Sequence, residues 1–220
     1  MKKFLPHIIA IVAFLVITFI YFFPLLEGKE LKQSDINNWK GMSQEIISFQ
    51  EKTGEHIYWT NSMFGGMPGY QISAIYGANL IQYIDKAILF LPAPANLFFL
   101  FLIGFYFLLI TLKVDSRVAM IGSFAFAFSS YLIIFLVTGH NSKVHAIGYM
   151  APVIAGIIMT YRGRMWLGAA LTGLFLALEL NANHLQITYY LMLMVVMLGI
   201  AEMYTAFKEK RMAQFGKATV

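Results

Sequence analysis

The sequence predicts an all-α membrane protein, a polytopic bundle of roughly six transmembrane helices with a long polar loop after the first. Three observations predict this fold class. Of the residues, 59% are hydrophobic and 12% are charged, whereas soluble domains carry about 25% charged residues. The longer apolar stretches reach the ~20 residues that cross a bilayer. Their residues do not alternate, which favours helices over a barrel.

The expected spans are the six longest apolar stretches. They are Phe4–Leu26, Pro94–Leu112, Val118–Val137, Ala146–Tyr161, Trp166–Leu180 and Ile187–Phe207. The fourth and fifth are the shortest, at about 15 or 16 residues. We therefore expect segments 143–150 and 181–183 to extend them beyond the hydrocarbon. A cleaved signal peptide is the alternative for the first stretch, but no small-residue cleavage site follows it.

Basic residues fall on one side of the membrane if every expected span crosses it. They are Lys2, Lys3, Lys113, Arg117, Arg162, Arg164, Lys208, Lys210 and Arg211. The short loops on the other side contain one basic residue, Lys143. Because cytoplasmic loops are enriched in Lys and Arg, this pattern predicts a cytoplasmic N-terminus and an extracytoplasmic 27–93 loop. The net charge of +5 is then a topology signal and not a nucleic-acid patch. The absence of cysteine excludes a disulfide framework and a thiol nucleophile.

Two amphipathic helices are predicted within the 27–93 loop. The first begins near Ser34 and ends at Gly54, with one apolar stripe formed by Ile36, Trp39, Met42, Ile46 and Phe49. The second runs from about Asn79 to Leu91, with Leu80, Tyr83, Ile84, Ala87 and Ile88 on one face. Three glycines and a proline predict an irregular turn between these helices. The loop contains five lysines and seven acidic residues, Asp85 among them.

Three segments resemble motifs of a known family. Segment 58–68, YWTNSMFGGMP, resembles the "LWNPY-FGGMP" segment of YfhO-type bacterial membrane proteins. Segments 139–143, GHNSK, and 183–190, NHLQITYY, are similar to that family's later outer-loop motifs. One membrane helix followed by a loop with an early Asp and two interfacial helices also resembles the GT-C superfamily of glycosyltransferases. The resemblance covers nearly the whole chain.

This resemblance implies a GT-C-like fold and sugar transfer from a polyprenyl-phosphate carrier at the outer face of a bacterial inner membrane. The acceptor would be a cell-envelope glycan or glycolipid. Two departures matter. GT-C enzymes often carry an acidic pair in the first loop, whereas this chain has the single carboxylate of Asp35. The chain also lacks the later helices and the soluble domain of many such enzymes. We therefore expect an N-terminal fragment whose partner is the remaining C-terminal part.

Asp35 is the candidate catalytic residue. A carboxylate just outside the membrane can accept a proton from an acceptor hydroxyl or help to orient a divalent metal such as Mg²⁺ or Mn²⁺. The alternative is that Asp35 only favours the N-terminus of a helix. Gly65, Gly66 and Pro68 are expected to shape the loop backbone rather than to contact substrate.

A second group of candidates lies at the predicted outer membrane edge, where a lipid phosphate needs cations and hydrogen-bond donors. These residues are His140, Asn141, Lys143, His145, Glu179, Asn183, His184 and Gln186. Lys143 is the predicted phosphate partner, and Glu179 is expected to pair with His184 or Lys143. Solvated turns and helix ends are the alternative for all of them.

Two other functions remain open for this sequence. One is a transporter or flippase for a lipid-linked solute, although no expected span carries a charged residue near its middle, where transport pathways commonly place one. The other is a non-catalytic membrane assembly subunit, for which Asp35 and His184 would be dispensable. P-loop, HExxH and GxSxG motifs are absent from the sequence.

Overall fold

The computed structural model describes residues 4–72 and 78–219, and the described chain is all-helical apart from one short strand pair. The predicted all-α class is confirmed. Its α-helices are α1 (Leu5–Tyr21), α2 (Phe23–Leu26), α3 (Ser34–Thr53), α4 (Ile81–Ile88), α5 (Ala95–Thr111), α6 (Ser116–Ala127), α7 (Ser130–Thr138), α8 (Asn141–Tyr161), α9 (Met165–Asn181), α10 (Leu185–Lys208) and α11 (Met212–Thr219). Strands β1 (Trp59–Thr60) and β2 (Met67–Pro68) pair antiparallel and are followed by a 3-10 turn, η1 (Gly69–Gln71). Lys2 and Lys3 of the predicted charge pattern lie outside the described residues.

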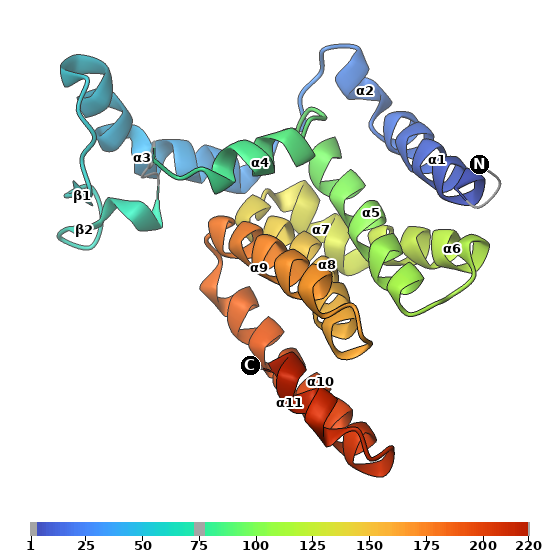
Figure 1. Cartoon of the computed structure of the whole chain (residues 1–220). Helices are drawn as coiled ribbons and strands as arrows, with labels where there is room; N and C mark the ends of the chain where they lie inside the picture. Colours follow the sequence, from blue (N-terminus) through green and yellow to red (C-terminus); the bar gives the residue numbers. More distant parts are fainter. Residues whose placement is uncertain (1–3, 73–77, 220) are drawn as a thin grey trace.

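Three helices form the centre of the bundle, with α8 packing against both α5 and α9 (Figure 1). Helices α1 and α6 also pack against α5, and they contact each other. Phe14 of α1 and Phe98 and Leu102 of α5 are fully buried among these helices. Because lipid tails are as apolar as such side chains, close packing rather than removal from water stabilises membrane helices against one another.

Small residues allow α8 and α9 to approach closely. A Cβ added at Gly156 of α8 would lie 2.6 Å from the Thr172 hydroxyl oxygen, and one added at Gly168 of α9 would overlap the Thr160 backbone. Each threonine donates its hydroxyl to the glycine carbonyl one turn earlier, Thr160 to Gly156 at 3.0 Å and Thr172 to Gly168 at 2.8 Å. The contact therefore has the small-xxx-small pattern of membrane helix pairs, with its hydroxyls satisfied.

All six expected spans are helical, but their lengths differ from the prediction. In the described part of the chain, α8 and α10 are long and apolar enough to cross a membrane, and a bent pair, α6 with α7, could count as a third span. The expected extension of the fourth span through segment 143–150 forms and goes two residues further, because α8 begins at Asn141 and has 21 residues. Helices α1, α5 and α9 have 17 residues each, the lower limit of the usual range of about 17 to 25.

The first and third expected spans are broken. Phe22 separates α1 from α2, and α6 and α7 meet at a 48° bend near Ser129. No proline or glycine lies at the second break. The two halves pack differently, α6 against α5 and α1, and α7 against α8. We therefore attribute the bend to packing with different neighbours rather than to local sequence.

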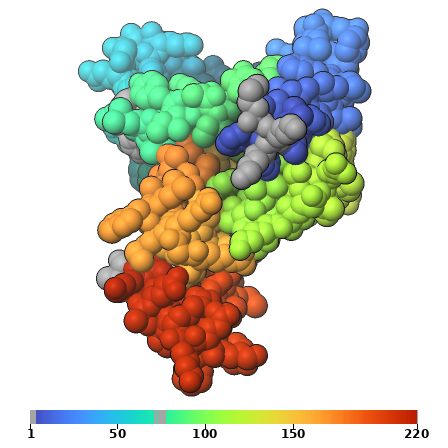
Figure 2. Space-filling view, turned by 45° about the vertical axis from the view of Figure 1, so that its right-hand side comes forward, coloured from blue at the N-terminus to red at the C-terminus, as the bar shows by residue number. Residues whose placement is uncertain are grey.

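Helix α10 is far more exposed than α8, the other helix long and apolar enough to cross a membrane. It buries 11% of its apolar stretch, against 72% for α8. Figure 2 shows α10 and α11 projecting from the rest of the molecule. Its apolar side chains, such as Val196 and Met197 at 59% and 71% exposure, are suited to lipid or to further helices.

Both predicted loop helices form, with small differences. Gly54 ends α3 at a φ of 74°, as expected. The helix begins at Ser34, and its N-cap is Gln33. Helix α4 is shorter than predicted, and the expected apolar face apart from Ile88 is turned outward, with Leu80 73% exposed. The face packed against the bundle contains Ile81 and Ile88, with the buried Asp85 between them.

Candidate functional site

The N-terminus of α3 docks against the turn between α7 and α8. The Gln33 amide donates to the Leu136 carbonyl at 2.6 Å, and the Ser34 hydroxyl donates to the Thr138 carbonyl at 3.3 Å. These contacts bring the carboxylate of Asp35 to 2.8 Å from Nδ1 of His140. The two side chains are 34% and 49% exposed, so the pair remains open to solutes. Asp35 and His140, both candidates from sequence, thus form a carboxylate–imidazole pair.

Gly139 determines how closely α3 approaches this turn. Its φ is 95°, a left-handed conformation that L side chains rarely adopt. A Cβ at this position would lie 2.8 Å from Cβ of Gln33 and 3.5 Å from Cβ of Asp35. The glycine therefore leaves the space in which the α3 backbone carries Asp35 to His140.

Lys143 lies one turn along α8 from this pair. Its ammonium stands 3.6 Å from the centroid of the Phe135 ring and 5.5 Å from that of Tyr131. A cation over an aromatic face is stabilised by the ring quadrupole and keeps part of its hydration. Asn141, in the same turn, accepts a hydrogen bond from Gln33 at 3.4 Å. Lys143 is thereby held at the N-terminal end of α8.

His184 borders the same region from the start of α10. Burial is the main cause that lowers the pKa of its imidazole, and the charges of Lys143 and His140 lower it further. Its Nδ1 is buried and has no hydrogen-bond partner on another described residue. A neutral imidazole with one unsatisfied buried nitrogen is suited to a donor or acceptor supplied by a ligand.

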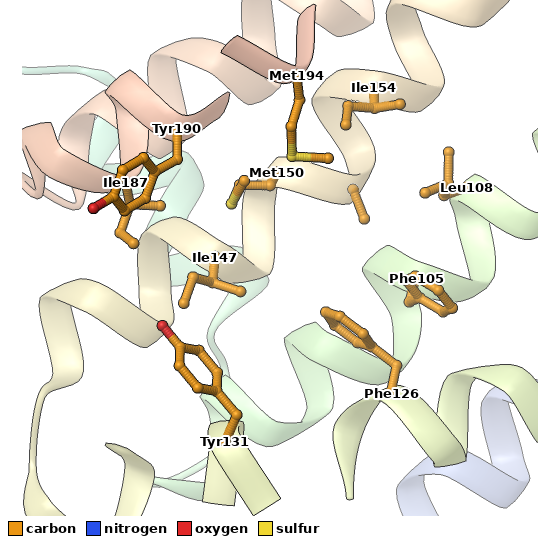
Figure 3. A pocket seen from close by; sticks show the side chains of 11 residues that line it. Phe105, Leu108, Phe126, Tyr131, Ile147, Met150, Ile154, Ile187, Tyr190 and Met194 are labelled. Carbon is orange, nitrogen blue, oxygen red and sulfur yellow. The ribbon is translucent and has the colours of Figure 1, made fainter. Parts of the chain in front are cut away.

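An apolar groove lies between α10 and helices α5, α6, α7 and α8 (Figure 3). It has a volume of about 330 Å³ and is lined by Phe105, Leu108, Phe126, Tyr131, Ile147, Met150, Ala151, Ile154, Ile187, Tyr190 and Met194. Tyr131, over whose ring Lys143 lies, is one of these residues. Ile147 and Ile154 lie two turns apart on α8, so the groove extends about 10 Å along the helix. Sequence reasoning missed this groove because it is formed by five separate helices.

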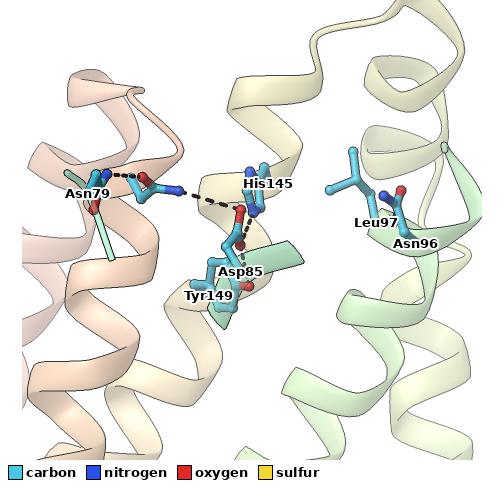
Figure 4. Close-up of polar contacts among 7 residues, drawn as sticks. Asn79, Asp85, Asn96, Leu97, His145 and Tyr149 are labelled. Carbon is cyan, nitrogen blue, oxygen red and sulfur yellow. Dashed lines mark hydrogen bonds and ion pairs between the residues drawn. The ribbon is translucent and has the colours of Figure 1, made fainter. Parts of the chain in front are cut away.

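A second carboxylate–histidine pair lies nearby and is buried. His145 Nε2 lies 2.9 Å from a carboxylate oxygen of Asp85, and the Tyr149 hydroxyl donates to the same oxygen at 2.7 Å. Asn181 contacts the other oxygen at 3.5 Å and accepts a hydrogen bond from Asn79 at 2.8 Å (Figure 4). Asp85 is 8% exposed. This network joins α4 to α8 and α9 and leaves little room for a ligand.

Sequence reasoning placed His145 among the residues expected to bind a lipid phosphate, whereas the structure pairs it with Asp85. The sequence analysis treated Asp85 only as one of the acidic residues of the 27–93 loop. A usable signal was present, because Asp85 follows Ile81 by four residues and precedes Ile88 by three, which puts it on one face with them. A carboxylate on the packed face of a helix needs partners, and His145 and Tyr149 supply them.

Glu179 is fully buried in α9 and has a partner that differs from the expected ones. The Thr188 hydroxyl lies 3.0 Å from each oxygen of the carboxylate and donates to it. The predicted pairing with His184 or Lys143 is therefore wrong. Because Thr188 belongs to α10, the contact ties α10 to the end of α9.

Asn183 and Gln186, the other candidates of this segment, point elsewhere. The Asn183 amide donates to the Tyr70 carbonyl at 3.0 Å, and its backbone has a φ of 55°. The exposed Gln186 amide donates to the Tyr190 hydroxyl at 2.7 Å, and Tyr190 lines the apolar groove. Of the two, Gln186 borders the groove, whereas Asn183 holds the 58–72 segment.

The glycine-rich segment forms a tight loop held by Glu45 of α3. The carboxylate accepts a hydrogen bond from the Thr60 hydroxyl and from the backbone N–H groups of Asn61 and Ser62, at 2.9 and 3.0 Å. These bonds, that of Thr60 first, lower the pKa of Glu45. Gly65 and Gly66 have φ values of 73° and 121°. Pro68, in β2, pairs with Trp59.

This loop lies apart from the Asp35–His140 pair. Figure 1 places β1 and β2 beyond the distal part of α3. Glu45, which binds the loop, follows Asp35 by almost three turns of α3, about 15 Å of helix. The loop therefore does not contribute to the surroundings of Asp35 in this structure.

The side chains around Asp35 supply few metal ligands. Among the described residues, no three His, Asp or Glu side chains converge to hold an ion. The pair offers one carboxylate and one imidazole, which are already hydrogen-bonded to each other. Magnesium is commonly held by one or two carboxylates together with substrate phosphates. The side chains by themselves thus do not form a resident metal site.

Comparison with known proteins adds no assignment. The chain matches no protein-family model, no curated protein and no solved structure.

Proposed function

We propose that the chain is the membrane part of a GT-C-like glycosyltransferase that uses a polyprenyl-phosphate-linked sugar. The single observation that carries this proposal is the arrangement at the outer end of α8. The open Asp35–His140 pair lies one turn from Lys143, and Lys143 lies over a tyrosine that lines an apolar groove. The carboxylate of Asp35 would face the sugar, the ammonium of Lys143 would face the phosphate, and the apolar groove would hold the hydrocarbon chain.

In the proposed reaction, an acceptor hydroxyl attacks the anomeric carbon of the sugar. The carbon–oxygen bond to the phosphate breaks, and the phosphate leaves with the electron pair. Asp35 takes the proton of the attacking hydroxyl, and His140, hydrogen-bonded through Nδ1, orients the carboxylate.

Lys143 and His184 would bind the leaving phosphate. The ammonium of Lys143 offsets the negative charge that develops on the phosphate as the bond breaks. His184 can donate or accept one hydrogen bond through its unsatisfied Nδ1. The carrier chain would enter the groove from the bilayer beside α10, whose exposed side chains suit a lipid environment.

The proposed orientation places all of these residues at the outer membrane surface. Basic residues of the α5–α6 and α8–α9 turns gather at the opposite end of the bundle, where Arg162 reaches the Thr111 carbonyl at 3.5 Å. This distribution supports a cytoplasmic N-terminus and six crossings. The inner-membrane location rests on the family resemblance alone. Helices α3 and α4, at the other end, would then lie at the outer interface.

The test uses membranes that contain the full-length protein. Polyprenyl phosphates carrying radiolabelled glucose, mannose or N-acetylglucosamine are added, and label is counted in glycan and glycolipid fractions. Asp35→Asn is expected to reduce transfer by about a hundredfold, the lower range for loss of a general base. Glu51→Gln, an exposed carboxylate on the same helix, is the matched control.

Two results would overturn the proposal. Equal transfer by the Asp35→Asn variant and the parent protein at equal expression would remove Asp35 from the chemistry. Failure of the parent protein to transfer any of these sugars would reject the activity itself.

A further inference from the structure

A basic hollow lies at the end of the bundle opposite Asp35. Its volume is about 320 Å³, and it is lined by Phe107, Ile110, Thr111, Lys113, Met159, Arg162 and Arg164. The basic residues belong to two turns, the one after α5 and the one after α8. Among the described residues, no acidic side chain lines the hollow, although Asp115 lies close by in the chain and caps α6 by accepting the Arg117 backbone N–H at 2.9 Å.

The backbone of both turns is closed without help from these side chains. After α8, Gly163 has a φ of 93° and the Arg164 N–H donates to the Met159 carbonyl at 3.0 Å. After α5, Lys113 has a φ of 64° and the Val114 N–H donates to the Leu109 carbonyl at 3.0 Å. Both are Schellman-type ends, in which backbone N–H groups satisfy the last helix carbonyls. These backbone bonds do not involve the cationic groups, although the Arg162 guanidinium also donates to the Thr111 carbonyl at the end of α5, at 3.5 Å.

A topology signal alone does not explain the hollow. The positive-inside rule depends on the number of basic residues near a span and not on their convergence. Here three cationic side chains from separate turns border one space whose other walls include Phe107, Ile110 and Met159. Cations beside an apolar wall suit an amphiphile with an anionic head, and guanidinium groups can bind phosphate through paired N–H donors.

We propose that this hollow binds the phosphate headgroup of an anionic phospholipid from the leaflet on that side of the membrane. The phosphate would contact Arg162, Arg164 and Lys113, and an acyl chain would lie along Phe107 and Ile110. Such a lipid would bridge the α5–α6 and α8–α9 turns. Basic pockets between membrane helices on the cytoplasmic side are suited to anionic headgroups. The site is independent of the proposed glycosyltransferase activity.

The experiment measures lipid binding by native mass spectrometry of the full chain in detergent micelles, where membrane orientation plays no part. Phosphatidylglycerol is titrated in, with phosphatidylcholine as the neutral probe. Arg162→Gln and Arg164→Gln are each expected to weaken phosphatidylglycerol binding about fivefold. Phosphatidylcholine binding should not change. Arg117→Gln and Lys208→Gln are the matched controls, because they remove one charge near the same end and do not line the hollow.

Three outcomes would overturn the proposal. The first is that the control variants lose as much phosphatidylglycerol binding as the Arg162 and Arg164 variants, which would mean that the overall positive charge attracts the lipid. The second is equal binding of phosphatidylglycerol and phosphatidylcholine by the parent protein. The third is displacement of the lipid by an equimolar concentration of inorganic phosphate, which would make the hollow a site for free phosphate. Thermal unfolding in the same detergent checks that each variant is folded.

Discussion

The two carboxylate–histidine pairs on α8 have nearly the same geometry but different surroundings. His140 lies 2.8 Å from Asp35 and His145 lies 2.9 Å from Asp85. The Asp35 side chain is 34% exposed and that of Asp85 is 11% exposed. Tyr149 and Asn181 also bind Asp85. The distance between carboxylate and imidazole therefore does not by itself identify an accessible site. Burial and further partners make the Asp85–His145 pair structural, whereas the Asp35–His140 pair stays accessible.

The largest expected effect comes from breaking the buried pair. Asp85→Ala leaves His145, Tyr149 and Asn181 without a shared acceptor, and loss of one partner from a buried network costs about 3 kcal/mol. Thermal unfolding of the purified protein in detergent measures the change, and limited proteolysis should detect release of α4. Glu51→Ala, on an exposed part of α3, is the control. A loss no greater than that of the control would show that Asp85 does not hold α4.

A smaller effect is expected when one hydrogen bond is removed from the same network. Tyr149→Phe keeps the ring, which packs with Leu100 and Leu178, and deletes the hydroxyl that binds Asp85. The expected cost is about 1 kcal/mol of unfolding free energy. Combination with Asp85→Ala tests the assignment, because the hydroxyl should contribute nothing once its acceptor is gone. Additive losses would contradict a direct Tyr149–Asp85 bond.

The open pair should contribute little to stability. Asp35→Asn is expected to change the unfolding free energy by about 0 to 1 kcal/mol, since exposed ion pairs are weak. The same variant is expected to lose sugar transfer. Unfolding and transfer measured on one preparation separate the two roles. A destabilisation as large as that of Asp85→Ala would make Asp35 a structural residue and remove the contrast between the pairs.

The smallest effect concerns pH and His184, beside the open pair. Burial lowers its pKa below the ordinary value of 6.5, so the unfolded chain binds this proton more readily than the folded chain. Stability should therefore fall as pH drops below 6.5 towards the folded pKa, and His184 should contribute no pH dependence above 6.5. NMR titration of the imidazole and unfolding of His184→Gln, which should lose this slope, provide the check. A His184 resonance that titrates above 6.5 would contradict the burial argument.

Much of the helical framework could be predicted from the sequence, because the apolar stretches are long and are separated by short polar segments. The predicted ends of α5 differ from the observed ends by one residue. The extension of α8 to Asn141 was partly predicted, since polar residues can continue a helix beyond the hydrocarbon. The bend at Ser129 was not predicted, because it depends on packing against two different neighbours.

The candidate site was predictable to a smaller extent. Residues close in sequence to a helix end, such as His140 and Lys143, could be grouped by topology alone. The carboxylate partner of each histidine could not be predicted, because it depends on where α3 and α4 dock. Both helices dock through contacts with residues about 100 positions away in the chain. The apolar groove could not be predicted either, because the sequence does not show which helices pack next to one another.

Gly139 has a consequence for sequence variation at this position. Since its missing side chain is what admits Gln33, even alanine there would push the start of α3 outward. The carboxylate of Asp35 and the ring of His140 would then separate, although neither residue had changed. The identity of one residue outside the pair thus determines whether the carboxylate and the imidazole can meet.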